Sequence, residues 1–168
     1  NEIKTIAEII RRVQKTGLAY EIVIVDDGST DGTRPFLHTL VGKSGFQVIF
    51  HEHNQGKGAA LRRGFQEVTG DVVVIQDADL EYDPNEYPQL LRPIQDGRAD
   101  VVYGSRFLGG PHRVLLFWHS VGNKWLTTFS NMLSNLNLTD METCYKVFKK
   151  EILDKVQLKS KRFGFEPE

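Results

Sequence analysis

The chain has 168 residues, and its 21 Lys and Arg residues against 22 Asp and Glu residues leave a formal net charge of −1. This length suits a single domain with its own core. The near-neutral charge argues against nucleic acid as the main partner, because phosphate-binding proteins usually carry a strongly basic face. The single cysteine, Cys144, excludes an intramolecular disulfide and favours a reducing, cytoplasmic compartment.

Predicted helices and strands alternate through the first two thirds of the chain. Apolar residues at helical spacing predict a helix over 2–16, and β-branched residues predict a strand over 21–25. Further strands are predicted at 47–50, 71–75 and 100–103, and further helices at 33–41, 57–68 and 85–96. Such alternation predicts an α/β fold with a mostly parallel sheet.

A different pattern covers 114–136, where apolar residues at steps of three and four predict one long helix with a break near Gly122. Its wide apolar stripe has two interpretations. One is core packing. The other is an interfacial helix that meets lipid, which Trp118, Trp125 and the nearby Lys124 favour. The two interpretations are compatible on opposite sides of the helix.

Acidic residues follow two of the predicted strands. Asp26 and Asp27 follow one strand, and Asp77 and Asp79 follow another. Ligands bind beyond the carboxyl ends of parallel strands, so we expect four carboxylates in one crevice. Like charges at that distance raise each other's pKa unless a cation lies among them. We therefore expect a divalent metal, Mg²⁺ or Mn²⁺, on Asp77 and Asp79, with Glu81 beside them.

Other polar residues have simpler explanations beside functional ones. The residues at 56–58, Gly-Lys-Gly, open a predicted helix and either face a phosphate group or allow close packing, but they lack the P-loop pattern. Arg106 follows the strand at 100–103 and either neutralises a diphosphate or forms a surface ion pair. For Asp31 and Asp83, capping of the following helix is the preferred explanation.

Four motifs, in this order, resemble those of the family 2 glycosyltransferases, and within them the dolichol- or polyprenyl-phosphate sugar synthases. They are VDDGSTDGT at 25–33, NQGKGAA at 54–60, QDADLE at 76–81 and GSRF at 104–107. The resemblance implies a single catalytic domain over 1–168 with the Rossmann-like GT-A fold, which binds a nucleotide sugar and a divalent metal. It also implies that a first strand precedes Asn1 and that a membrane-proximal part follows 163–168.

The resemblance assigns roles to individual residues. It implies that the catalytic residues are Asp77, Asp79, Arg106 and Asp140, and that the metal ligands are Asp77, Asp79 and Glu81, the last of which is commonly Gln in relatives. It implies contacts with the nucleotide sugar for Glu2, Val25, Asp26, Asp27, Lys57, Ala78 and Lys146.

The implied reaction moves a sugar from GDP-mannose or a UDP-sugar to a polyprenyl or dolichyl phosphate, with inversion, at the cytoplasmic face of a membrane. A phosphate acceptor needs no strong general base, so the metal and Arg106 would stabilise the departing nucleoside diphosphate. Three alternatives stay open. A sugar hydroxyl acceptor needs a general base, for which Asp140 is the first candidate. A receiver-like domain would bind Mg²⁺ through Asp26, Asp27 and Asp77. A binding module would keep the nucleotide site without turnover.

Overall fold

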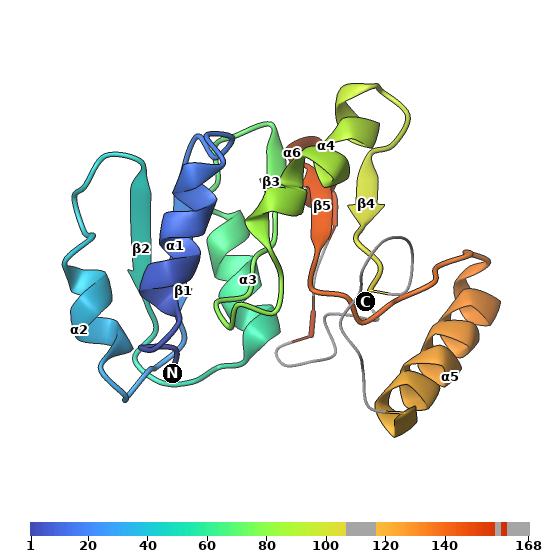
Figure 1. The fold of residues 1–168 in the computed structure, drawn as a ribbon, viewed down its shortest axis with the longest axis horizontal. Coiled ribbons are helices and arrows are strands. Elements are labelled where there is room, and N and C mark those ends of the chain that lie inside the picture. Colours follow the sequence, from blue (N-terminus) through green and yellow to red (C-terminus); the bar gives the residue numbers. More distant parts are fainter. Residues whose placement is uncertain (107–116, 157–158, 161–168) are drawn as a thin grey trace.

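The computed structural model of the chain describes residues 1–106, 117–156 and 159–160 (Figure 1). Its helices and strands are, in order, α1 (Ile6–Lys15), β1 (Ile22–Asp26), α2 (Thr33–His38), β2 (Phe46–Phe50), α3 (Lys57–Phe65), β3 (Val72–Val74), a 3₁₀ turn η1 (Pro84–Glu86), α4 (Tyr87–Gln95), β4 (Val101–Tyr103), α5 (Phe117–Ser134), β5 (Lys146–Lys149) and α6 (Lys150–Leu153). Each helix and strand predicted for the first two thirds of the chain is confirmed, within a few residues at its ends.

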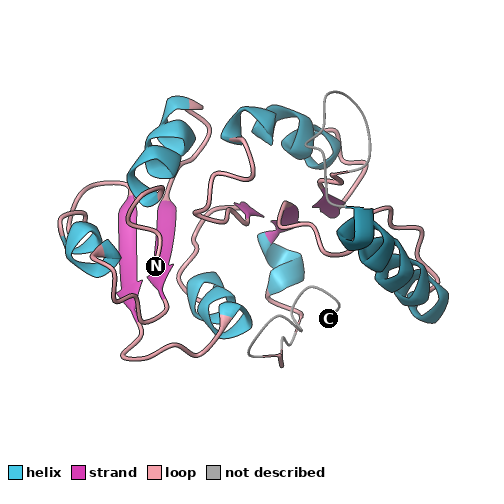
Figure 2. Ribbon diagram, turned by 60° about the horizontal axis from the view of Figure 1, so that its bottom comes forward, coloured by secondary structure: helices cyan, strands magenta, loops and turns pink. Residues whose placement is uncertain are grey.

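The described strands form two sheets (Figure 2). Strands β1 and β2 pair in parallel, as predicted, and the structure places Ile22 opposite Phe46 and Asp26 opposite Phe50. Strands β3 and β4 lie on either side of β5, and β5 runs antiparallel to both. Strand β5 is not predicted from the sequence. Its residues, Lys-Val-Phe-Lys, have a lysine at each end and too few apolar residues to predict a strand.

Helix α1 is shorter than predicted because residues 2–5 form a separate turn. The backbone N–H groups of Thr5 and Ile6 both donate to the Glu2 carbonyl, at 3.1 and 2.8 Å. The Glu2 N–H donates to Thr33 Oγ1 at 2.9 Å, and the Ile3 N–H donates to Asp31 Oδ2 at 3.2 Å. These bonds join the start of the chain to the loop after β1, so Glu2 lies beside that loop.

Two apolar clusters hold the strands and helices together. The first joins α1 to α2 and β2, and the second joins α4 to β5 and the residues after β3. The first contains Ile6, Ile9, Ile10, Leu37 and Leu40; the second contains Val13, Ile75, Tyr82, Tyr87, Leu90, Ile94, Cys144, Tyr145 and Val147. Side chains of both clusters flank residues 75–82, so the acidic loop after β3 is anchored on two sides.

Helix α5 lies at the edge of the molecule, apart from the β1–β2 sheet (Figure 1). It runs unbroken through Gly122, so the predicted break is wrong. Its apolar residues are largely exposed, with Trp125 at 75% and Met132 at 76%, and for these residues the core-packing interpretation is also wrong. Residues 114–116 of the predicted long helix, Phe107 of the GSRF motif and the segment 163–168 lie outside the described residues. In the part of the chain that is described, no helix is both long enough and apolar enough to cross a bilayer.

Candidate active site

Asp26 is the last residue of β1, and its side chain is buried within the fold. Its Oδ2 accepts hydrogen bonds from Arg34 Nε at 2.9 Å and from the Ser29 N–H at 3.4 Å. Among the described residues, its Oδ1 has no hydrogen-bond partner. Arg34 also donates to the His51 carbonyl and lies over the Phe50 ring, 5.4 Å from its centre. Arg34 therefore neutralises Asp26 and ties the end of β1 to the end of β2.

Asp27 holds the loop that leads into α3. Its Oδ1 contacts His51 Nδ1 at 2.7 Å and accepts the Gln55 N–H at 2.9 Å, while its Oδ2 accepts the Gly56 N–H at 2.8 Å. Burial alone would raise the pKa of Asp27, but these hydrogen bonds outweigh burial and lower it below 3.8. The ionised carboxylate is therefore the form that holds the loop.

This lowered pKa has a consequence for acid stability. A carboxyl group with a depressed folded-state pKa stabilises the fold above its unfolded pKa of about 3.9, and that contribution is lost as the pH falls through the folded value. We expect the urea midpoint to fall between pH 5 and pH 2.5. In Asp27→Asn the fall should be smaller, since the Asn side chain does not titrate. An equal fall in the two proteins would contradict this role of Asp27.

Asp77 follows β3 and forms an ion pair with Lys57. Lys57 Nζ, from the first residue of α3, lies 2.9 Å from Asp77 Oδ2. Gln76 fixes the backbone here: its Nε2 donates to the Asp77 carbonyl at 2.9 Å, and its Oε1 accepts the hydroxyls of Tyr87 and Tyr145, each at 3.0 Å. The neighbouring residues Gly56 and Lys57 thus contact Asp27 and Asp77 respectively, and join the two acidic groups.

Asp79 lies in a region of excess negative charge. Burial raises its pKa first, and the charges of Asp77, Glu81 and Glu2 raise it further, against a hydrogen bond from the Glu81 N–H at 2.9 Å. Leu80, between the two acids, has a φ of +63°, which is uncommon for a residue with a side chain. The charges of Glu2, Asp77 and Glu81 therefore all act on Asp79.

A divalent cation fits the chemistry of this loop. Carboxylate oxygens are the ligands that Mg²⁺ and Mn²⁺ prefer, and a cation would relieve the repulsion that raises the pKa of Asp79. Within residues 1–106, 117–156 and 159–160, no three His, Cys, Asp or Glu side chains converge closely enough to hold a metal ion. In the described conformation Lys57 meets Asp77, so side chains must rearrange for three of them to coordinate a metal.

Arg106 and Asp140 form a second, more buried ion pair. Arg106 donates to Asp140 from Nε at 2.7 Å, from Nη2 at 2.8 Å and from its backbone N–H at 3.0 Å. Asn123 Nδ2 on α5 adds a bond at 2.8 Å. Burial of the 1% exposed Asp140 acts to raise its pKa, but the hydrogen bonds from Arg106 and Asn123 outweigh burial and lower it. A carboxylate with a lowered pKa and four donors is a weak proton acceptor.

The segment between Asp140 and β5 joins the two ion pairs. The Cys144 N–H donates to the Tyr82 hydroxyl at 3.0 Å. Asp77 lies close enough to Cys144, and Arg106 close enough to Tyr82, to influence their pKa values. Tyr82 and Cys144 therefore lie between Asp77 and Arg106. Sequence reasoning missed both residues, because a lone tyrosine and a lone cysteine carry no motif.

The remaining predicted site residues lie around these groups. Val25 points toward α3, where its Cγ2 would be 3.4 Å from a Cβ on Gly64. Ala78 packs against the α1 cluster. Lys146 is 2% exposed; its Nζ donates to the Thr143 carbonyl at 2.5 Å and lies 5.2 Å from the centre of the Tyr103 ring. In this conformation Lys146 is a buried residue of the central strand of the three-stranded sheet.

Comparison with known proteins identifies the family of the chain. The family model described as glycosyl transferase family 2 matches residues 1–157. The chain belongs to glycosyl transferase family 2. The receiver-domain alternative is thereby excluded, and the mixed α/β fold is confirmed as the GT-A fold by the structural likeness described next.

Two kinds of relative are similar to this family 2 chain. The dolichol-phosphate mannosyltransferase of Pyrococcus furiosus is 39% identical over 112 residues, which are 66% of this chain and 32% of that protein. The crystal structure of glucosyl-3-phosphoglycerate synthase from Mycobacterium tuberculosis has a TM-score of 0.73 at 25% identity, covering 99% of this chain and 60% of that one. A complex of that synthase with Mn²⁺, UDP-glucose and phosphoglyceric acid has a TM-score of 0.72 at 25% identity, covering 99% and 59%. The family 2 chain thus spans about a third of the mannosyltransferase and three fifths of the synthase.

Proposed function

We propose that the protein is an inverting glycosyltransferase that moves a sugar from a GDP- or UDP-linked donor to a polyprenyl or dolichyl phosphate, using Mg²⁺ or Mn²⁺. The observation that carries this proposal is the acidic loop of a family 2 chain, in which Lys57 pairs with Asp77 and the charges of Asp77, Glu81 and Glu2 act on Asp79. A loop that offers carboxylates to a metal and an ammonium group to a phosphate suits a metal-bound diphosphate, whose charge needs several positive partners.

Within this proposal each polar group has a role. Asp77 and Asp79 would hold the metal, with Glu81 beside them, and the bound metal would stabilise negative charge on the departing diphosphate. Asp27 holds the 51–56 loop against the end of β1 and, with Asp26, shapes the nucleoside side of the site. Arg106, held by Asp140, presents a fixed positive charge to the phosphates.

The state of Asp140 supports a phosphate acceptor rather than a sugar hydroxyl. A hydroxyl acceptor must lose its proton to a base during transfer, whereas a phosphate oxygen is already ionised at neutral pH. Asp140, the first candidate base, is buried, has a lowered pKa and accepts hydrogen bonds from Arg106 and Asn123. The mannosyltransferase relative, which is named for dolichol phosphate, supports the same class of acceptor.

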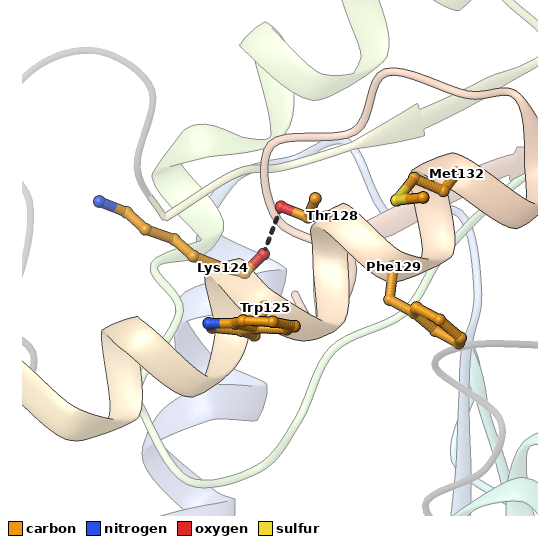
Figure 3. A pocket seen from close by; sticks show the side chains of 5 residues that line it. All are labelled: Lys124, Trp125, Thr128, Phe129 and Met132. Atoms are coloured by element: carbon orange, nitrogen blue, oxygen red, sulfur yellow. Dashed lines mark hydrogen bonds between the residues drawn. The ribbon is translucent and has the colours of Figure 1, made fainter.

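The exposed face of α5 supports the proposal that the protein works at a membrane surface, on its cytoplasmic side. A groove of about 320 Å³ along this helix is lined by Lys124, Trp125, Thr128, Phe129 and Met132 (Figure 3). In that view Trp125 and Phe129 extend from the lower side of the helix, and the Lys124 stem extends to the upper left. An exposed apolar face with tryptophan and a lysine at its border is typical of helices that lie in the headgroup region.

Two assays on the purified protein test this function. Melting temperatures are compared with GDP, UDP, GDP-mannose and UDP-glucose, each with Mn²⁺, Mg²⁺ or EDTA, because a ligand that binds the native state raises the midpoint. We expect a metal-dependent rise with one base only, which identifies the donor. Transfer is then measured to a polyprenyl phosphate in phosphatidylglycerol-containing vesicles and to a soluble oligosaccharide. Transfer to the oligosaccharide alone, or to neither acceptor, would refute the proposed lipid acceptor.

A further inference from the structure

The carboxylate of Asp140 has no lone pair left for a substrate in the described conformation. Its Oδ2 accepts the Arg106 N–H and Nε, and its Oδ1 accepts Arg106 Nη2 and Asn123 Nδ2. The residue is 1% exposed, whereas the Arg106 side chain is 30% exposed. The guanidinium therefore extends from a buried carboxylate toward the surface, and Asp140 sets its direction through three of its hydrogen bonds.

Asp140 is also where α5 joins the rest of the site. Among the residues of this helix whose burial is described, the buried polar ones are Asn123 and Thr127, at 7% and 4% exposure. Thr127 Oγ1 donates to Asn123 Oδ1 at 3.3 Å and accepts the Met141 N–H at 3.2 Å. A continuous chain of hydrogen bonds thus runs from α5 through Asn123 to Asp140, and from there to Arg106. The other face of the same helix carries the apolar groove.

We infer that Asp140 is a positioning residue that fixes Arg106 toward the donor diphosphate and couples its position to α5. This inference deepens the proposed function and rests on it. A shift of α5 moves Asn123, and Asp140 carries the shift to Arg106, since Asn123 and Arg106 both bond this carboxylate. The apolar face of α5 and the phosphate site are in this way mechanically linked, and Asp140 acts on the reaction only through Arg106.

A double-mutant cycle on nucleotide affinity tests this coupling without requiring turnover. GDP and UDP are each titrated by calorimetry in the presence of Mn²⁺, with guanosine and uridine as the matched ligands that lack phosphates. We expect Asp140→Asn to weaken the affinity for the nucleoside diphosphate about tenfold, the size usual for a residue that orients another. The affinity for the nucleoside should not change. In the Arg106→Lys background, Asp140→Asn should weaken the affinity for the nucleoside diphosphate by less than a further twofold. The reason is that lysine lacks the guanidinium group that Asp140 orients.

A second variant tests the link to α5 and guards against poor folding of Asp140→Asn. Asn123→Leu keeps the size of the side chain and leaves the Asp140–Arg106 pair in place. We expect Asn123→Leu to weaken the affinity for the nucleoside diphosphate about threefold in the wild-type background, and to leave it unchanged in the Arg106→Lys background. Ser134→Ala on the same helix is the control, since the Ser134 hydroxyl bonds only the Ser130 carbonyl one turn away in the described contacts, and should change neither affinity.

Two results would overturn the coupling. One is an equal loss of diphosphate and nucleoside affinity in Asp140→Asn and Asn123→Leu, which shows a general structural role. The other is the same loss with and without the Arg106→Lys change, which shows that Asp140 acts independently of Arg106. Sugar transfer by the wild-type protein is measured separately. If the affinities follow the expected double-mutant cycle but no sugar is transferred, the proposed function alone is rejected. If sugar is transferred normally but the effects of the Asp140 and Arg106 substitutions simply add, the coupling alone is rejected.

Discussion

Asp77→Asn should reduce sugar transfer about 1,000-fold while leaving the fold intact. A loss of that size corresponds to about 4 kcal/mol of transition-state stabilisation, within the several kcal/mol that a metal ion contributes at a developing negative charge. The amide keeps the shape of the carboxylate and one oxygen that can still accept a hydrogen bond from Lys57 Nζ. It removes the negative charge that a divalent cation needs.

Three measurements separate the metal role of Asp77 from a structural one. The melting temperature should change by less than about 3 °C, since a substitution on a partly exposed loop usually costs little. Mn²⁺ affinity, followed by the electron paramagnetic resonance of the free ion, should fall together with transfer. Asp71→Asn, the same substitution in the exposed residue just before β3, should change neither quantity. Full activity in Asp77→Asn would refute the metal assignment.

Gly28→Ala should have the largest effect on stability among the glycines of the nucleotide side. Gly28 has a φ of +77°, and a Cβ placed there would lie 2.7 Å from the Asn54 nitrogen and 2.8 Å from the His53 carbonyl carbon. Both contacts are with backbone, so relief requires the 51–56 loop to move away from Asp27. Strain from φ and overpacking together cost roughly 3 kcal/mol, which lowers the melting temperature by about 6–12 °C.

Gly42→Ala is the matched control for Gly28→Ala. Gly42 has nearly the same φ, +78°, but a Cβ there would meet no atom within 4 Å. It should therefore show the φ cost alone, about 1 kcal/mol, with unchanged nucleotide affinity. The difference between the two variants measures how tightly the loop packs on Gly28. Equal destabilisation in the two variants would mean that the 51–56 loop moves away from Gly28 at no cost in stability. The hydrogen bonds from this loop to Asp27 would then contribute little to the fold.

The α/β fold and the location of the acidic residues could be predicted because they depend on local patterns. β-branched runs that end in Asp26 and Asp77 predict strands whose carboxyl ends carry charge, and Lys57 follows a glycine at the start of a helix. What joins these groups depends on distant parts of the chain. Gln76 bridges Tyr87 and Tyr145, and Asp140 binds Arg106, 34 residues away. Periodicity does not reveal such partners.

The errors at α5 and β5 have a common physical cause. An apolar stripe at helical spacing predicts a buried face. Trp125 and Met132 nevertheless point away from the core, because the buried side of α5 carries Asn123, which bonds Asp140, and Thr127, which bonds Met141. Strand β5 is the converse: Lys146, at 2% exposure, lies in a buried strand although its residue type is typical of the surface. Burial in this half of the chain follows hydrogen bonding and sheet position rather than hydropathy alone.

The central place of β5 also determines the order in which this molecule can assemble. Strands β1 and β2 pair across about twenty residues, so their sheet has low contact order. In the described part of the chain, β3 and β4 share no hydrogen-bonded edge and both pair with β5, which lies more than seventy residues after β3 in the chain. During synthesis β3, the acidic loop and Arg106 therefore emerge before β5, and we expect the three-stranded sheet to form after the β1–β2 sheet.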